Sequence, residues 1–229
     1  MATFPHDPAA FTQGLEMHDG KLYQSAGGFG TSFLTVSTLE TGAVSARADL
    51  ADDVFAEGIT VVGDKLWQLT WRNNVAVLRD RASLAAEKDF PVEGEGWGIC
   101  YDPGRDLLVT SDGSSDLTLR DPHSFAVIRR VAVTLDGNPR DRLNELECAG
   151  GKVWANVWED DVFVRIDLDE GPGQGKVTDV VQVGKLPDFD SGILNGIAAL
   201  PGTEELLITG KNWPHLYRVR LEKTAAPNQ

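Results

Sequence analysis

Apolar and polar positions alternate along this chain in short runs, and turn-forming residues separate the runs. Five segments share one order: an opening residue that is usually polar, a short apolar strand, a turn, and a second apolar strand. Gly- or Asp-containing turns between alternating runs are typical of β-hairpins. The segments are QGLEMHDGKLYQSAGG from Gln13, EGITVVGDKLWQLTW from Glu57, WGICYDPGRDLLVTSD from Trp97, NELECAGGKVWANVW from Asn144 and NGIAALPGTEELLITGK from Asn195.

The hairpins recur at a regular interval. Their starts lie 44, 40, 47 and 51 residues apart, and residues 78–84 resemble residues 119–125, 41 positions later. Residues 82–88 alone could form a short helix, but the repeat predicts a turn between outer strands. An interval of about 45 residues with four short strands is that of a propeller blade. We therefore predict an all-β fold: a five-bladed β-propeller, with blades of four antiparallel strands around a central channel, as a single domain over residues 1–229.

The last blade needs a strand from elsewhere. Its repeat supplies three strands and ends at LYRVRL, so the fourth is expected from a terminus. Residues 223–229 have a poor strand sequence, and residues 1–4 are short. A stretch upstream of Met1, absent from this sequence, is therefore a further candidate for the closing strand.

Two rings of equivalent positions are expected at one mouth of the channel. The first ring opens the hairpins and contains Gln13, Glu57, Trp97, Asn144 and Asn195. The second ring lies 14 to 16 residues further on and contains Gly27, Trp71, Asp112, Trp158 and Lys211. A hairpin places the start of one strand beside the end of the next. The rings together predict an aromatic pocket with a few polar groups, the usual form of a small-molecule or peptide-end site.

Glu57 lies in the stretch FAEGIT, directly after Phe55 and Ala56. A carboxylate in such an apolar run costs several kcal/mol if it stays charged and unpaired, so buried carboxylates are usually paired, protonated or functional. Glu57 could also be a structural acid that accepts backbone N–H groups. Similarly, any one ring tryptophan could be core, Lys211 a solvated lip residue, and Asp112 a turn former. Trp67 and Trp154 are expected in the core.

The composition excludes several classes of function. The chain has 21 basic and 35 acidic residues, a net charge of −14, which disfavours nucleic acid as a partner. No apolar run is long enough to span a membrane, and no signal peptide precedes MATFPHDPAAF. The chain is therefore cytoplasmic, or it is periplasmic or secreted with its signal removed, and we favour the second location. A monomer is expected.

No metal site is predicted. The sequence has no CxxC, HExxH or Cys/His cluster. The stretch DLDEGPGQG imitates a calcium loop, but Thr178 stands at the twelfth position, where a glutamate is required. Cys100 and Cys148 lie one residue apart in the repeat register, and alternate strand residues face opposite ways. We therefore predict that these two cysteines are not bonded to each other.

The quoted stretches resemble one known family, the plant and bacterial type of glutaminyl cyclase (glutaminyl-peptide cyclotransferase). The matching stretches span all five repeats: FPHDPAAFTQGLE, FAEGIT, LWQLTW, EGWGICYD, LLVTSDGSSDL, LNELE, VWANVWEDDVFVRID, ILNGIA and LITGKNWPHLY. The resemblance implies a five-bladed propeller that cyclises the N-terminal glutamine of peptides or proteins to pyroglutamate and releases ammonia. It implies no metal and no organic cofactor.

The family's site residues, carried over by motif, fall on the two rings. Glu57 takes the role of general acid/base, and the candidate donors to the oxyanion of the tetrahedral intermediate are Lys211, Asn144, Gln13 and the indole N–H groups. The expected pocket residues are Gln13, Phe55, Trp71, Trp97, Trp158 and Asn195. One departure is the stretch YQSAGGFGTS, where the family usually has a carboxylate-bearing segment, so the first blade's part of the rim is expected to differ.

Two other functions remain open at the level of sequence. A non-catalytic propeller that binds peptide ends would need the same tryptophan pocket but not Glu57. A calcium-dependent propeller lactonase would use Glu57 and the two asparagines as metal ligands, which three tryptophans and a lysine at the mouth argue against. Loss of activity on chelation would distinguish the lactonase.

Overall fold

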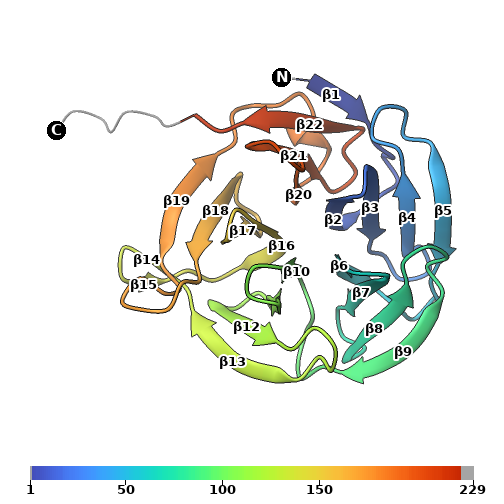
Figure 1. Cartoon of the computed structure of the whole chain (residues 1–229). Coiled ribbons are helices and arrows are strands. Elements are labelled where there is room, and N and C mark those ends of the chain that lie inside the picture. The colour runs from blue at the N-terminus through green and yellow to red at the C-terminus, as the bar shows by residue number, and fades with distance from the viewer. Residues whose placement is uncertain (1, 223–229) are drawn as a thin grey trace.

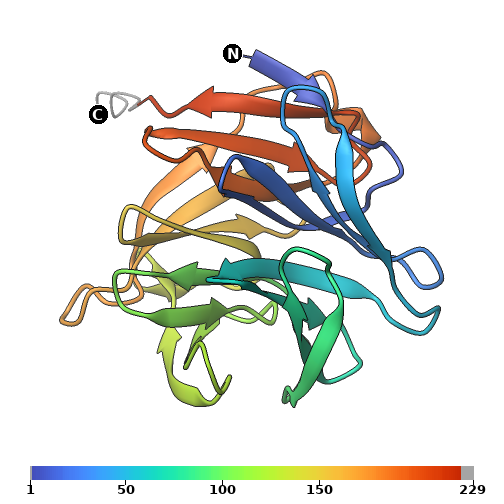
Figure 2. The same cartoon turned by 45° about the vertical axis from the view of Figure 1, so that its right-hand side comes forward.

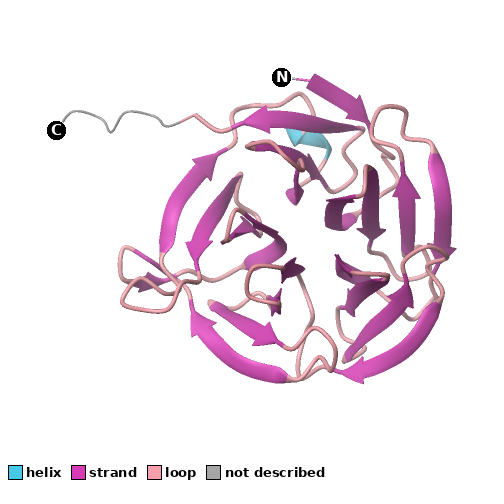
Figure 3. Cartoon of the chain, in the orientation of Figure 1, coloured by secondary structure: helices cyan, strands magenta, loops and turns pink. Residues whose placement is uncertain are grey.

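Strands make up nearly all the regular structure of this chain. The structure, a computed structural model, describes residues 2–222, and five four-stranded antiparallel sheets stand around a central axis. Figure 1 shows the sheets as blades of a closed ring, Figure 2 shows the same ring obliquely, and Figure 3 shows that a single short helical turn, η1 (Phe189–Ser191), interrupts the strands. The predicted five-bladed propeller is confirmed.

Four of the five blades run outward from the axis in chain order. Blade 1 contains β2 (Thr12–His18), β3 (Lys21–Ala26), β4 (Phe33–Ser37) and β5 (Val44–Asp49). Blade 2 contains β6 (Ala56–Val62), β7 (Lys65–Thr70), β8 (Val75–Asp80) and β9 (Ala86–Pro91). Blade 3 contains β10 (Ile99–Asp102), β11 (Leu107–Thr110), β12 (Asp116–Arg120) and β13 (Val127–Ala132). Blade 4 contains β16 (Leu143–Ala149), β17 (Lys152–Val157), β18 (Val162–Asp167) and β19 (Val177–Gln182), after a small hairpin of β14 (Thr134–Leu135) and β15 (Asn138–Pro139).

The N-terminus closes the ring. Blade 5 contains β20 (Leu194–Ala199), β21 (Glu205–Gly210) and β22 (His215–Arg220), and its outer strand is β1 (Ala2–Pro5). Phe4 pairs with Leu216 in an antiparallel register, so the first strand of the chain is bonded to the last. The expected terminal strand is therefore β1; residues 223–229 lie outside the described part of the chain.

The core is divided among the interfaces between blades. Five clusters of buried apolar residues each join two neighbouring blades. Trp67, 1% exposed, stacks on Phe125 of the next blade with 4.7 Å between ring centroids. Trp154 packs against Phe163 at 5.8 Å. Both tryptophans belong to the core, as the sequence predicted.

The matched outer turns are built in the same way. Arg79 donates to the Leu84 carbonyl and Arg120 to the Phe125 carbonyl, at 2.8 and 3.2 Å. Leu84 and Phe125 both have a positive φ, 62° and 60°. The stretch around residue 84 is thus a turn into β9 and not a helix. Since the repeat relates equivalent structures, equivalent positions on the inner strands also occupy equivalent places.

The cysteine prediction is wrong: Cys100 and Cys148 form a disulfide, with 5.4 Å between their Cα atoms. Cys100 lies on β10 and Cys148 on β16, the innermost strands of neighbouring blades. Blades pack face to face, so a side chain on the forward face of one blade meets a side chain on the rear face of the next. Because Cys100 and Cys148 point to opposite faces of their own blades, their two sulfur atoms meet at the interface between the blades.

Candidate active site

A local irregularity marks the same place on four innermost strands. Gln13, Glu57, Asn144 and Asn195 are each the second residue of β2, β6, β16 and β20. The pairing of these four strands with their hairpin partners shifts register across those positions. Such β-bulges turn side chains away from their regular direction and are common beside active sites. In the remaining blade, Trp97 precedes β10 by two residues.

Glu57 lies at the base of this ring and is only 3% exposed. Its Oε1 accepts a hydrogen bond from Gln13 Nε2 at 2.8 Å. Asn195 Nδ2 donates in turn to Gln13 Oε1 at 3.1 Å and to the Thr12 carbonyl at 2.8 Å. This chain of bonds fixes the orientation of all three side chains. Burial raises the pKa of Glu57 well above its usual value, although the charge of Lys211 acts in the opposite direction.

Lys211 supplies a buried cation whose charge acts on this carboxyl. It directly follows β21, where its backbone N–H donates to the Ile193 carbonyl at 2.8 Å. Its Nζ lies 4.6 Å from the centroid of the Phe11 ring, and the residue is 5% exposed. Burial lowers the pKa of Lys211 to about 8, and the interaction with Glu57 opposes that shift. An amine with such a pKa is a strong hydrogen-bond donor near neutral pH.

Three buried acceptor atoms of the ring have no hydrogen-bond partner among the described residues. They are Glu57 Oε2, Asn144 Oδ1 and Asn195 Oδ1. A buried polar atom without a partner costs about 1–3 kcal/mol, and such atoms are unusual enough to need an explanation. A molecule that presents N–H groups would satisfy all three.

Four of the predicted aromatic residues pack against one another in two pairs. Phe55 and Trp71 lie edge to face, with 5.5 Å between centroids, and Trp97 and Trp158 do so at 5.7 Å. Each of these four side chains is partly exposed. Gly27 makes room for them, because a Cβ at this position would lie 2.1 Å from the Phe55 ring. The structure therefore gathers the predicted tryptophans and Phe55 at the same mouth.

Glu95 holds two of these tryptophans, and sequence reasoning missed it. Its Oε2 accepts the indole N–H of Trp71 at 2.8 Å and that of Trp97 at 2.9 Å. Its Oε1 accepts from Arg72 at 2.8 Å, and the guanidinium of Arg72 lies 3.8 Å from the centroid of Trp71. The expectation that these two indole N–H groups donate to an oxyanion is therefore wrong, because both are already bonded to Glu95.

Asp112, another of the predicted ring residues, forms a turn in its own loop. Asp112 is exposed and accepts hydrogen bonds from the backbone and hydroxyl of Ser114, at 3.0 and 2.5 Å. This arrangement is a side-chain turn, which agrees with the structural alternative for Asp112.

Among residues 2–222, no group of three or more His, Cys, Asp or Glu side chains is placed to hold a metal ion, and no helix is long and apolar enough to cross a membrane.

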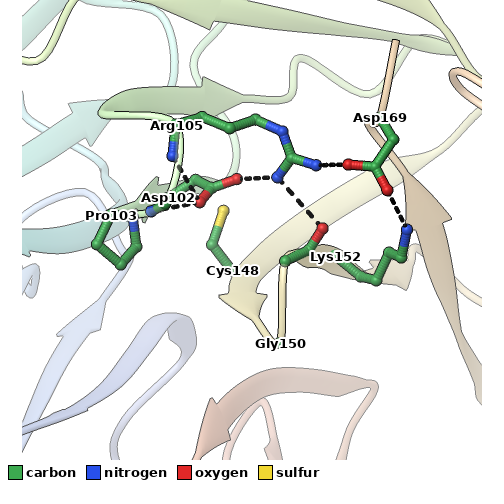
Figure 4. Close-up of a pocket in the computed structure, with 9 residues that line it drawn as sticks. Asp102, Pro103, Arg105, Cys148, Gly150, Lys152 and Asp169 are labelled. Atoms are coloured by element: carbon green, nitrogen blue, oxygen red, sulfur yellow. Dashed lines mark hydrogen bonds and ion pairs between the residues drawn. The ribbon is translucent and has the colours of Figure 1, made fainter. Parts of the chain in front are cut away.

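A second hollow lies at the far ends of β10 and β16, away from these residues. It has a volume of about 380 Å³ and adjoins the disulfide through Cys148. Figure 4 shows Arg105 between Asp102 and Asp169, and Lys152 beside Asp169. Because these opposite charges are paired with one another, the hollow offers no unpaired group for chemistry.

Comparison with known proteins gives one consistent result. The family model for glutamine cyclotransferase matches residues 1–221. A glutaminyl-peptide cyclotransferase of Arabidopsis thaliana is 37% identical over 232 residues, which cover 99% of this chain and 72% of that protein. The crystal structure of Myxococcus xanthus glutaminyl cyclase is 35% identical, with a TM-score of 0.84 over 96% of this chain and 94% of that one. A chain of Kuenenia stuttgartiensis hydrazine synthase, 14% identical with a TM-score of 0.52, shares the fold alone.

Proposed function

The chain belongs to the glutamine cyclotransferase family, and on this premise we propose that it converts the N-terminal glutamine of peptides or proteins to pyroglutamate with release of ammonia. The observation that carries the proposal is the buried carboxyl of Glu57, which has one oxygen bonded to Gln13 and one oxygen without a partner among the described residues. The substrate brings the N–H groups that this pocket lacks.

Glu57 is the proposed general acid/base. It takes a proton from the α-ammonium group, and the freed nitrogen forms a bond to the side-chain amide carbon. Glu57 returns this proton to the amide nitrogen, and the bond between that carbon and nitrogen breaks. The carboxylate then takes the second proton from the ring nitrogen, and this proton leaves with the ammonia as ammonium. A pKa raised by burial suits a group that must both accept and donate.

Lys211 is the proposed stabiliser of the negative charge that develops on the amide oxygen. Its ammonium interacts electrostatically with Glu57 and is largely withdrawn from water, and a fixed donor in such a site stabilises an oxyanion strongly. Asn144 and Asn195 orient the substrate, because their unpartnered Oδ1 atoms can accept N–H groups of its amine and amide. Gln13 positions Glu57.

The aromatic side chains provide a close-fitting cage. Phe55, Trp71, Trp97 and Trp158 enclose the space above Glu57 and favour the folded conformation in which the amine meets its own side-chain amide. Aromatic faces also attract an ammonium group. These contacts leave no step that requires a metal ion or an organic cofactor, and we propose that the reaction uses neither.

The proposed setting follows from charge and from the disulfide. A net charge of −14 disfavours nucleic acid, and the partners are peptides or proteins with N-terminal glutamine. Disulfides persist mainly in oxidising compartments, so the Cys100–Cys148 bond supports a periplasmic or secreted location. A monomer suffices, because every proposed site residue comes from one chain.

The test is ammonia release from a glutaminyl dipeptide amide by the wild-type protein, by Glu57→Gln, and by the wild type after treatment with a chelator. We expect release that survives the chelator and falls roughly 10²- to 10⁴-fold in the variant, the usual value of acid–base catalysis. Glu145→Gln is the matched control, since Glu145 is equally buried but lies outside the pocket. No release by the wild type would favour a peptide-end-binding propeller, and loss with the chelator would favour the metal-dependent alternative.

A further inference from the structure

Phe29 is an exposed aromatic residue at the mouth of the pocket. It lies on the loop between β3 and β4 and is 57% exposed. The other large exposed apolar side chains within residues 2–222 are Val44, Val127, Ile128 and Val180, which lie on the outermost strands β5, β13 and β19. Exposed apolar groups beside a pocket often mark a contact with a ligand.

The loop holds Phe29 in place. Gly30 has a φ of 75°, which suits glycine, and its N–H donates to the Asp52 carbonyl at 2.9 Å. Ser32 Oγ donates to the Gly28 carbonyl at 2.8 Å and accepts from the Ala56 N–H at 3.0 Å. The loop is therefore bonded to the segment that carries Glu57, so the position of Phe29 is fixed relative to the proposed acid/base.

Phe29 continues the aromatic wall outward. Its ring centroid lies 5.4 Å from that of Phe55 and 6.3 Å from that of Trp71. Phe55 is two residues from Glu57 in the chain. Exposure rises along this path, from 3% for Glu57, through the partly exposed Phe55, to 57% for Phe29. The wall thus leads from the carboxyl to the surface.

The spacing of residues along the substrate's backbone determines which substrate residue lies beside the aromatic wall. When the N-terminal glutamine occupies the pocket, the next residue follows at about 3.8 Å from Cα to Cα. That residue must lie at the pocket's exit. Building on the proposed function, we infer that Phe29 is a specificity-determining residue that contacts the side chain after the N-terminal glutamine and favours aromatic and other apolar side chains there.

The experiment compares kcat/KM for glutaminyl-phenylalanine amide and glutaminyl-glycine amide. The proteins are the wild type, Phe29→Ala, Phe29→Leu and the control Ile128→Ala, which removes an exposed apolar side chain far from the site. We expect the preference for phenylalanine over glycine to fall roughly 3- to 10-fold in Phe29→Ala, the usual worth of one aromatic contact. Phe29→Leu should retain part of the preference, and Ile128→Ala should retain all of it.

A binding measurement separates this inference from the proposed function. Quenching of tryptophan fluorescence gives the affinity of both amides for Glu57→Gln and for Glu57→Gln/Phe29→Ala, with no turnover required. If the wild type releases no ammonia, the proposed function fails, and the ratio of affinities still tests Phe29. An equal loss for both amides, or an unchanged ratio in turnover and binding, would overturn the role in specificity and leave Phe29 a structural support for Phe55.

Discussion

Glu57 and Glu145 occupy two levels of the same channel. Both lie on innermost strands, β6 and β16, and both are buried, at 3% and 1% exposure. Burial raises the pKa of both carboxyls well above the usual value. Their hydrogen bonds differ. Glu145 accepts the backbone N–H of Leu15 at 3.3 Å through Oε1 and that of Ile197 at 2.8 Å through Oε2, so it joins β16 to β2 and β20.

The difference teaches how to separate a structural acid from a candidate catalyst. Burial and a raised pKa are common to both residues, so neither property identifies the active one. Both oxygens of Glu145 are satisfied by backbone, whereas Glu57 leaves the buried Oε2 without a partner among the described residues. The unpartnered oxygen is therefore the more informative observation, and variants at the two levels should have opposite effects on activity and stability.

The largest effect beyond Glu57 is expected from Lys211, at the pocket level. Replacement by methionine keeps much of the side-chain volume and removes the donor to the oxyanion. We expect kcat to fall by roughly 10²- to 10³-fold, the usual cost of losing one such donor. In the wild type, kcat should decline as the pH rises through about 8, where Lys211 loses its charge. Steady-state kcat as a function of pH measures both features.

Ionisation of Glu57 is expected to produce the acidic limb of the same profile of kcat against pH. Because the pKa of Glu57 is raised, kcat should increase with pH until that carboxyl has ionised. Lys211→Met should lose the decline near pH 8 and move this limb to higher pH, because the charge of Lys211 lowers the pKa of Glu57. A variant that retains wild-type kcat and the same alkaline decline would exclude Lys211 as the donor.

The next prediction compares the free energies of unfolding of the variants Glu145→Gln and Glu57→Gln. Glutamine at position 145 presents an NH₂ group to one of the two backbone N–H donors, so we expect the free energy of unfolding to fall by about 1–3 kcal/mol at pH 5. Glutamine at position 57 keeps an oxygen for Gln13 and places its NH₂ where no partner exists. One unpartnered buried group replaces another, so the free energy of unfolding should stay close to that of the wild type. Urea denaturation of the two variants at one pH gives the comparison.

The pH dependence has a defined sign. A carboxyl whose folded-state pKa is raised stabilises the fold most below its unfolded pKa of about 4.5, and this contribution is lost as the pH rises through the folded pKa. Neither amide ionises. Relative to the wild type, both variants should therefore gain stability as the pH rises from 5 to 8. A constant difference at all pH values would show that the carboxyls do not titrate as buried groups.

The residues at the level of Glu57 could be predicted because equivalent positions recur from blade to blade. Hairpin geometry placed both rings at one mouth of the channel, with Gln13, Glu57 and Asn195 at matched positions of the first ring and Lys211 in the second. The bulges could not be inferred from the sequence, since they depend on how each innermost strand pairs. They place Asn144 and Glu145 in succession within one bulge of β16, where one lies at the pocket and the other within the channel.

Residues outside the repeat were missed for a physical reason. Phe11 precedes β2, Phe29 lies in the loop after β3, and Glu95 lies in the connection between β9 and β10, so all three lie outside the positions from which the two rings were drawn. A charged residue in a glycine-rich connection looks like a solvated loop residue. The signal that could have identified Glu95 is its place two residues before a ring tryptophan. The disulfide was missed because facing was judged within each blade and not across the interface.

The smallest effect is expected from Glu95, which supports the pocket level from outside the ring. Glu95→Gln replaces one oxygen by NH₂, so either the two indole N–H groups or Arg72 loses its acceptor. The tryptophans should then hold the substrate less firmly, with KM rising about tenfold, equivalent to roughly 1.4 kcal/mol. The charge of Glu95 also helps raise the pKa of Glu57. Its removal should move the acidic limb of kcat to lower pH.

The rise in KM and the shift of the acidic limb together distinguish a positioning role of Glu95 from a general destabilisation of the fold. A variant that merely loosens the fold would lower activity at every pH without moving the acidic limb. Glu93→Gln provides the matched control, because it removes the same charge from an exposed side chain in the same connection without touching Trp71 or Trp97. If Glu93→Gln shifts KM and the acidic limb as far as Glu95→Gln does, the effect is one of overall charge. If only Glu95→Gln shifts them, the carboxylate acts through the two tryptophans and through Glu57.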